Sequence, residues 1–186
     1  MTLTPGLYAA NAMRTILQRI RTHFELGFGA TYAGRVNYGD PLFDVTALDP
    51  RNTARQFWTT LNFLVAAPGA DIPMVLQVDH FYEAGDAGDA GGDPYGYKVA
   101  AVADDFRISF GRGGIASDRG FQVYDYSVTP ATPTATDEWF LIINSRGSQG
   151  MPESEVPAPV EHGLRRITQT YQIKSASDLA SPMVYF

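Results

Sequence analysis

The sequence predicts an α+β protein, mostly β, in which an N-terminal amphipathic helix packs on an antiparallel sheet or sandwich with long loops and an extended C-terminal arm. Residues 5–24 carry apolar side chains at helical spacing, and residues 73–174 hold several stretches rich in β-branched and aromatic residues, separated by Gly, Pro and Asp. A chain of 186 residues suits one domain. We expect four parts in order: a helix over 5–26, an irregular connection over 27–53, a β domain over 54–175 and a tail over 176–186.

The predicted helix has recognisable start and stop signals. Thr4 suits the N-cap and Pro5 the first helical position, where its missing N–H costs no hydrogen bond. Gly27 supplies the stop. One face is apolar at the three-and-four spacing of a helix: Met13, Ile16, Leu17, Ile20 and Phe24. Arg14 and Arg21 stand on the opposite side, so we expect this helix to lie across a sheet with its arginines outward.

Two long strands are predicted in the first half of the β domain. Residues 74–82 alternate between two sets of side chains, which predicts a long strand with one face more buried than the other. Residues 97–102 and 106–110 are rich in Tyr, Val, Phe and Ile. These residue types favour strands, so we expect a second long strand that bends near Asp104 and Asp105.

Four further segments complete the predicted sheet. Residues 55–65 fit either a strand or a short helix, of which we favour the strand, and residues 121–128 form a returning strand. Residues 139–143 are nearly all apolar, as expected for a central strand covered on both faces. Residues 167–174 alternate apolar side chains with Thr, Gln and Lys, which predicts a last strand with one polar face.

Other segments have little to pack in a core. Residues 84–94 are mostly Gly, Ala and Asp and predict a mobile hairpin tip or long loop. Residues 145–159 contain three prolines among Ser, Gly and Glu, which predicts an extended arm. The tail ends in an apolar stretch that includes Tyr185 and Phe186, and such side chains need a surface to cover them. We expect that surface on a neighbouring subunit.

Composition narrows the function classes. The net charge of −6 disfavours generic nucleic-acid binding, which depends on Lys and Arg that neutralise phosphates. The absence of cysteine excludes disulfides and thiolate metal sites. No signal-peptide layout and no long apolar span are present, so we expect no membrane insertion. A charged fraction of only 18% fits homo-oligomeric contacts or an aromatic-rich β core.

Charge is unevenly distributed along the chain. Residues 1–35 carry four arginines against Glu25, whereas residues 71–105 carry eight acidic residues against Lys98. A basic end and an acidic middle attract each other within one fold or between neighbouring copies. Two differently solvated faces would give the same pattern.

The strongest metal candidate is the acidic loop with Asp86, Asp89 and Asp93. Calcium loops place oxygen ligands at every second position around a glycine turn, and the D-x-D-x-D-G pattern is absent here. We therefore favour a solvated loop over a cation site, and expect no bound metal.

No catalytic motif is apparent. The three histidines, His23, His80 and His162, lie far apart in the sequence and show no helical zinc spacing. His80 and Asp79 lack a G-x-S-x-G nucleophile elbow that would complete a hydrolytic triad. We expect a non-enzymatic protein with no catalytic residue and no cofactor.

The order of elements resembles that of small structural proteins of tailed bacteriophages, with tail-terminator and neck proteins closest. The layout that carries the resemblance is the helix over 5–24, the strands over 74–82 and 97–110, and the closing strand over 167–174. The resemblance implies a homo-oligomeric ring, typically of six copies, that caps the tail tube and joins it to the head. It also implies a location in the virion, assembly in the host cytoplasm and contacts with neighbouring tail or neck proteins.

For such a ring we expect contacts from the basic helix, the acidic loop, the arm and the tail: Arg14, Arg19, Arg21, Asp86, Asp89, Asp93, Glu153, Glu155, Tyr185 and Phe186. Tail tube, tail completion and capsid decoration proteins remain alternatives within this class. A carbohydrate- or ligand-binding β-sandwich is the alternative from another class, with four surface aromatics: Tyr95, Tyr97, Tyr124 and Tyr126. A hydrolase with a composite site ranks last.

Overall fold

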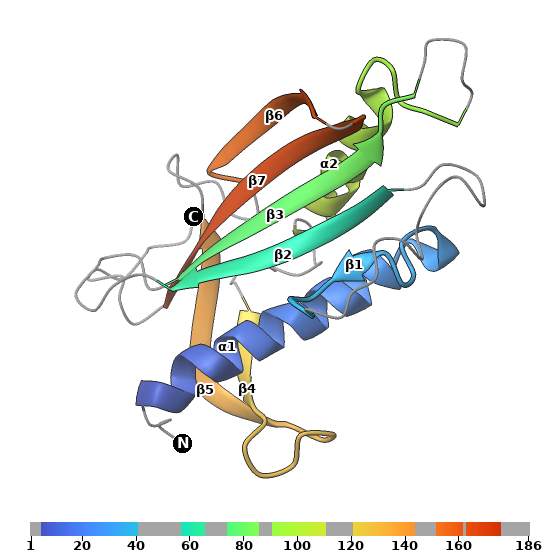
Figure 1. The fold of residues 1–186 in the computed structure, drawn as a ribbon. Coiled ribbons are helices and arrows are strands. Elements are labelled where there is room, and N and C mark those ends of the chain that lie inside the picture. The colour runs from blue at the N-terminus through green and yellow to red at the C-terminus, as the bar shows by residue number, and fades with distance from the viewer. Residues whose placement is uncertain are drawn as a thin grey trace.

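The computed structural model describes residues 5–40, 57–65, 74–85, 91–110, 121–143, 152–161 and 163–175. It confirms the α+β class, with an N-terminal helix and a mainly antiparallel sheet (Figure 1). The helical elements are α1 (Pro5–Ile20), the π-helical turn η1 (Arg21–Glu25), the short η2 (Gly29–Thr31) and α2 (Tyr97–Phe110). The strands are β1 (Val36–Asn37), β2 (Phe57–Val65), β3 (Met74–Glu83), β4 (Phe121–Asp125), β5 (Thr134–Ile143), β6 (Ser154–Glu161) and β7 (Leu164–Ser175).

The strands follow the order β1-β2-β3-β7-β5-β4, with β6 added on β7. β1 pairs with β2 in parallel and the other pairs are antiparallel. One edge of β7 is occupied by β3 alone. Its other edge is divided: β6 pairs with residues 164–170, and β5 pairs with residues 172–175.

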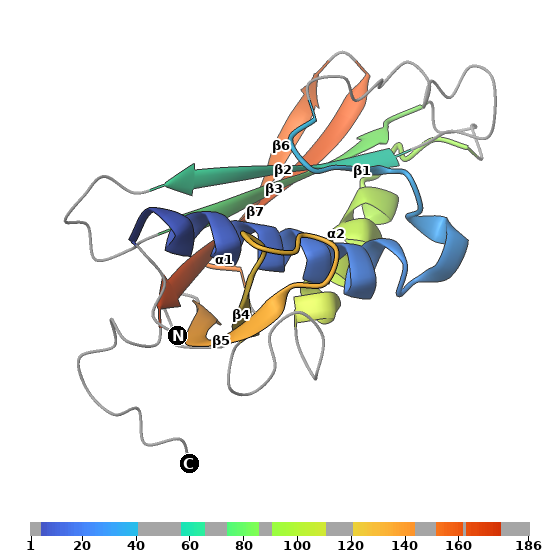
Figure 2. The same cartoon turned by 90° about the horizontal axis from the view of Figure 1, so that it is seen from below.

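Strand alternation gives the sheet a covered face and an open face. In β3, Leu76, Val78 and His80 are fully buried and pair with residues of β2 and β7 whose side chains point to the same side. Figure 2 shows α1 and α2 on this side of β2, β3 and β7. In the described part of the chain no helix lies on the opposite side, which we call the open face.

The helix α1 lies between the sheet and the β4–β5 hairpin (Figure 2). Its predicted apolar face is confirmed, because Ile16 and Ile20 are fully buried in the main core, as is Phe24 in the following η1 turn. Burying each such side chain contributes roughly 1.5–3 kcal/mol. Arg14 and Arg21 are exposed, as predicted, and the segments over 55–65, 74–82, 121–128 and 167–174 contain strands close to their expected bounds.

The predicted strand over residues 97–110 is wrong, because this segment is the helix α2. Its buried residues recur at three- and four-residue intervals: Val99, Val102, Ala103 and Phe106. Asp93 supports the start of the helix, since its Oδ2 accepts a hydrogen bond of 2.8 Å from the Val99 N–H. The bend expected at Asp104 and Asp105 is ordinary helix.

The described parts of two segments that were predicted to be loosely held are hydrogen-bonded to the rest of the fold. In the arm over 145–159, residues from Ser154 onward belong to β6, which pairs with β7. The described ends of the loop over 84–94 are fixed, because the Ala84 N–H donates to the Gly163 carbonyl over 2.7 Å and the Asp93 N–H to the Glu83 carbonyl over 2.9 Å. The irregular connection over 27–53 contains η2 and β1.

The apolar segment over 139–143 lies within β5, which pairs with β7 and with β4, so the predicted strand is confirmed. The expected cover on both faces is wrong at Trp139, which is 37% exposed. The tail over 176–186 lies outside the described residues.

Candidate contact surfaces

A pocket of about 290 Å³ opens between α1 with its η1 turn and the β4–β5 hairpin. Both the helix and the hairpin contribute walls, so the pocket exists only because these distant segments pack together. Its lining residues are Thr15, Gln18, Arg19, Thr22, His23, Tyr124, Tyr126 and Pro133. We call this site the arginine pocket.

Hydrogen bonds from buried polar side chains of α1 fix the hairpin wall of the arginine pocket. Asn11 donates from Nδ2 to Asp125 Oδ1 and accepts at Oδ1 from the Tyr126 N–H, each over 3.2 Å. Thr15 Oγ1 accepts from the Tyr124 N–H over 3.1 Å. These bonds satisfy backbone donors in β4 and in the residue that follows it, and they hold the two tyrosines beside the helix.

The arginine pocket combines cationic and aromatic groups. The guanidinium of Arg14 lies 4.7 Å from the centre of the Tyr126 ring, which is a cation–π distance. Partial burial lowers the pKa of Arg19 from its usual value. Burial and the neighbouring Arg19 lower the pKa of His23, so the imidazole is neutral at pH 7. Such a site favours a partner that brings a carboxylate together with an apolar or proline side chain.

The outer strand β6, together with Glu153 just before it, carries a different kind of surface. Glu155 and Glu161 are exposed and Glu153 is half-buried; we call these three residues the glutamate edge. Exposed apolar side chains lie among them, with Val156 at 56% and Val160 at 44% exposure. β6 also contains two prolines, which edge strands tolerate because one side of the strand needs no ladder hydrogen bonds.

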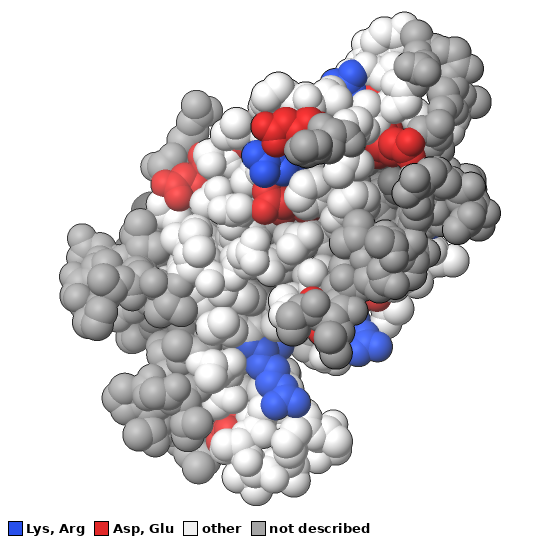
Figure 3. Space-filling model, viewed as in Figure 1, with Lys and Arg blue, Asp and Glu red and all other residues white. Residues whose placement is uncertain are grey.

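Charge is separated across the molecule. Figure 3 shows most of the red acidic atoms in its upper half, over β6, β7 and the nearby end of the sheet, with blue atoms among them. The largest blue groups lie below the sheet, where Figure 1 places α1. The surface between them is mainly uncharged.

The open face of the sheet is partly aromatic and partly polar. Trp58 and Phe81 stack with their ring centres 5.1 Å apart. Asp79 accepts hydrogen bonds from Thr168 and from Gln77, the latter over 2.9 Å. A smaller pocket of about 180 Å³ lies where β3, β6 and β7 meet, and its lining residues are Phe81, Ala158, Pro159, Glu161, Leu164 and Arg166.

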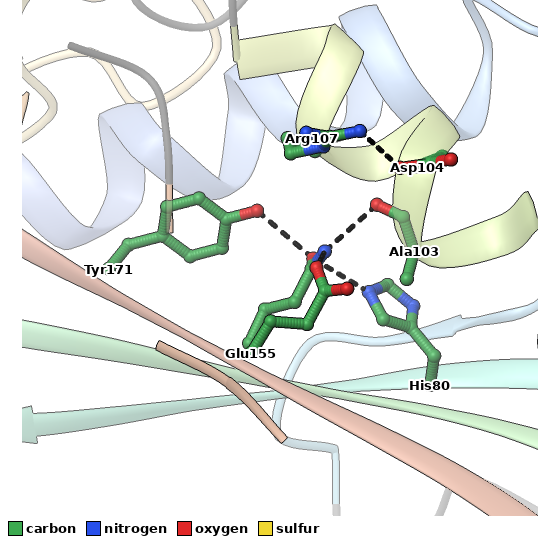
Figure 4. Close-up of polar contacts among 7 residues, drawn as sticks. His80, Ala103, Asp104, Arg107, Glu155 and Tyr171 are labelled. Atoms are coloured by element: carbon green, nitrogen blue, oxygen red, sulfur yellow. Dashed lines mark hydrogen bonds and ion pairs between the residues drawn. The ribbon is translucent and has the colours of Figure 1, made fainter. Parts of the chain in front are cut away.

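A buried hydrogen-bond network joins the strands to α2 beneath the covered face. The dashed lines in Figure 4 run from Tyr171, Ala103 and His80 to one amide, that of Gln169. Its Oε1 accepts from Tyr171 over 3.0 Å and from His80 Nε2 over 3.1 Å. Its Nε2 donates to the Ala103 carbonyl over 3.0 Å and to Glu155 Oε2 over 2.7 Å. We call this set the Gln169 network.

The protonation state of His80 follows from the Gln169 network. Because Gln169 Oε1 is an acceptor, His80 carries its proton on Nε2, and Nδ1 accepts from Thr59 Oγ1 over 2.9 Å. Complete burial lowers the pKa of His80 to about 4. The imidazole is therefore neutral, fully hydrogen-bonded and enclosed by the core, as expected of a structural group.

The structure brings together some of the sequence-predicted contact residues and separates others. Arg14 and Arg19 lie at the arginine pocket, Arg21 is exposed on η1, and Glu153 and Glu155 belong to the glutamate edge. Four other predicted contact residues lie outside the described part of the chain: Asp86, Asp89, Tyr185 and Phe186.

The prediction of Asp93 as a surface contact is corrected. Its side chain is only 2% exposed, because it binds the start of α2. In addition, Arg165 donates to the Asp93 carbonyl and fixes this turn against β7.

The four tyrosines of the ligand-binding alternative do not form one surface. Tyr95 and Tyr97 are 69% and 77% exposed near the start of α2, with ring centres 6.1 Å apart. Tyr124 and Tyr126 belong to the arginine pocket. Sequence reasoning missed the pocket residues Gln18 and His23; their helical spacing from Thr15 and Arg19 was the available signal.

Neither metal ligands, nor membrane-spanning helices, nor relatives among known proteins identify a further functional site. Among the residues that the structure describes, no three His, Asp or Glu side chains gather in a way that could hold a metal ion. Within the same residues, no helix has the length and apolar character needed to cross a membrane. Comparison of the chain with protein-family models, curated proteins and solved structures gave no significant match.

Proposed function

We propose that this chain is a non-enzymatic structural protein of a bacteriophage virion, which assembles into a ring of identical copies at the tail or the head–tail neck. The observation that carries the proposal is the separation of two complementary surfaces on one molecule. Arg14, Arg19 and Arg21 lie on α1 and η1, whereas the glutamate edge lies on β6 beyond β2, β3 and β7 (Figure 1).

Two different surfaces that attract each other favour head-to-tail association. Such a heterologous contact uses one surface of each copy, so it closes into a ring if the rotation between copies permits. Charge complementarity would select the partner and its orientation rather than supply most of the affinity. Affinity would come from apolar contact, for which Val156 and Val160 are available beside the glutamates.

The open face supports the same function. It is a broad sheet surface of low charge with the Trp58–Phe81 pair and the exposed Leu64, and oligomer contacts are depleted in charge and enriched in aromatic residues. A ring stacked on a tail tube or a neck would use such a face for its neighbours in the virion.

The test is the mass of the purified chain in solution across a wide concentration range, by light scattering and native mass spectrometry. We expect a defined oligomer. Arg14, Arg19 and Arg21 changed together to Glu should dissociate it while the far-ultraviolet circular dichroism of the monomer is kept. A second variant adds Glu153→Arg and Glu161→Arg to this triple change and should restore assembly. A wild-type chain that stays monomeric at every concentration would contradict the proposal.

A ligand-binding module is the second candidate, favoured by the exposed pair Tyr95 and Tyr97. Such tyrosines present flat faces on which sugar rings stack. This function predicts a monomer whose melting temperature rises with soluble sugars, and it predicts loss of that rise in Tyr95→Ala and Tyr97→Ala. A capsid decoration protein would instead bind purified heads rather than tails.

A further inference from the structure

We infer that the arginine pocket of one copy receives the exposed proline-containing segment of β6, residues 155–161, from a second copy. The inference rests on the proposed self-assembly and names the contact that would produce it. Both sides of this contact consist of described residues, and they match in charge, in polarity and in size.

The pocket side offers aromatic walls with cationic groups at hand. Tyr124, Tyr126 and Pro133 provide flat apolar surfaces, of the kind that binds extended proline segments in other proteins. Arg19 lines the same cavity, and Arg14 lies over the Tyr126 ring. An arginine beside an apolar wall suits a carboxylate attached to a short apolar segment.

The β6 side offers that chemistry. Residues 155–161 read Glu-Val-Pro-Ala-Pro-Val-Glu, with a glutamate at each end and two prolines inside. All but Ala158 are exposed. The register places Glu161 opposite Leu164, next to the turn into β7, so Val160 and Glu161 project near the tip of a hairpin.

The prolines also decide how β6 can be recognised. A strand with two prolines lacks two N–H donors and is a poor template for the addition of another strand. Its side chains, rather than its backbone, are therefore the surface offered to a partner. A pocket that binds side chains is therefore a better receptor for β6 than an exposed strand edge.

Size agrees with this role. The pocket volume of about 290 Å³ is at the lower end of the roughly 300–1,000 Å³ typical of small-molecule sites. It accommodates one or two side chains, such as Glu161, whereas the rest of the segment would lie along the rim of the pocket.

The experiment measures the binding of a fluorescein-labelled peptide with the sequence of residues 153–162 to the full-length chain by fluorescence anisotropy. We expect saturable binding to the wild type. Arg19→Glu and Tyr124→Ala should each weaken binding about tenfold or more, as for residues at the centre of a contact. Lys98→Glu is the control for charge reversal, because Lys98 lies on α2 and does not line the pocket; binding should change less than about twofold.

Charge reversal provides a second arm. A peptide with Glu155→Lys and Glu161→Lys should bind the wild type weakly and the Arg19→Glu chain better than the unchanged peptide does. Thermal melting of each variant shows that the chain remains folded. No peptide binding, or equal binding by the Arg19→Glu and Lys98→Glu chains, would overturn the pocket contact.

The pocket contact and the ring can fail separately. If the wild type assembles but the Arg19→Glu chain assembles equally well, the ring uses another surface and the pocket inference is wrong. If the wild type never assembles, the proposed function is wrong, and the inferred contact between copies is wrong with it. In that case the peptide titration measures only whether the pocket binds an acidic, proline-containing peptide.

Discussion

The Gln169 network and the arginine pocket are both polar sites built around tyrosines, yet they have opposite relations to solvent. In the network, the Gln169 amide bonds to Tyr171, His80 and the Ala103 carbonyl inside the core. In the pocket, Arg19 and His23 line a cavity that opens at the surface.

The difference shows how to separate structural from functional polarity in a chain without catalytic motifs. Polar groups that are buried and satisfied by one another specify packing, and their loss lowers stability. Polar groups that line an open cavity can be reached by a partner, and we expect their loss to affect stability less. We therefore expect mutations in the network to reduce stability and mutations in the pocket to reduce assembly.

The largest effect is expected for Gln169→Leu. Loss of the amide leaves the His80 ring, the Tyr171 hydroxyl and the Ala103 carbonyl without this partner inside the core. Since each orphaned buried group costs about 1–3 kcal/mol, we expect the free energy of unfolding to fall by about 3–4 kcal/mol. Chemical denaturation measures this change, and Gln18→Leu at the pocket is the control, with an expected change within about 0.5 kcal/mol. Equal losses for both variants would remove the distinction between the two sites.

The next effect is a pH dependence that arises from His80. The folded chain keeps this imidazole neutral down to a pKa of about 4, whereas the unfolded chain binds the proton near the usual value of 6.5. Between these pH values the unfolded state binds more protons, so stability falls as the pH drops, by about 3 kcal/mol in total. Denaturation curves at several pH values should show this slope reduced strongly in His80→Gln and only slightly in His23→Gln, because the pKa of His23 is lowered as well. A slope that His80→Gln leaves unchanged would contradict the assignment.

A smaller effect is expected for Asn11→Ala, which removes two of the three hydrogen bonds that hold the hairpin wall against α1. We expect a loss of about 1–2 kcal/mol, because the Tyr126 N–H and Asp125 each lose a partner. The pocket wall loosens at the same time, so peptide binding should weaken as well. The exposed Asn62, changed to Ala, is the control in both measurements. Unchanged peptide binding in a destabilised Asn11→Ala chain would show that the wall is held by other contacts.

The smallest effect on stability is expected for Arg19→Ala. Its guanidinium lines a pocket open to solvent, so the free energy of unfolding should change by less than about 0.5 kcal/mol in thermal or chemical denaturation. The oligomer mass measured by light scattering should nevertheless decrease at low concentration. A stability loss comparable to that of Gln169→Leu would place Arg19 among the structural residues.

Elements with one consistent pattern could be predicted from the sequence. The apolar spacing that includes Ile16, Ile20 and Phe24 identified the first helix, and the alternation around Leu76 and Val78 identified β3. Such patterns depend only on which side of one element is buried, so they can be detected without knowing the rest of the structure.

The failures concern segments whose local signals conflict or whose partners are distant. In residues 97–110, Tyr, Val, Phe and Ile favour a strand, whereas the spacing of the buried residues is helical, and packing against the sheet decided the outcome. The arginine pocket depends on Asn11 contacting Asp125, 114 residues later. No local pattern reports a contact at that separation.

The divided edge of β7 keeps β6 apart from the β4–β5 hairpin, although β6 and β5 both pair with this strand. β6 occupies residues 164–170 of β7, and β5 occupies residues 172–175 with β4 and α1 beyond it. A force applied to β6 by a neighbouring subunit would therefore reach the pocket through β7 and the Gln169 network rather than through β5. Substitutions could adapt the β6 tip to a new neighbour while the hairpin that frames the pocket keeps its own pairing.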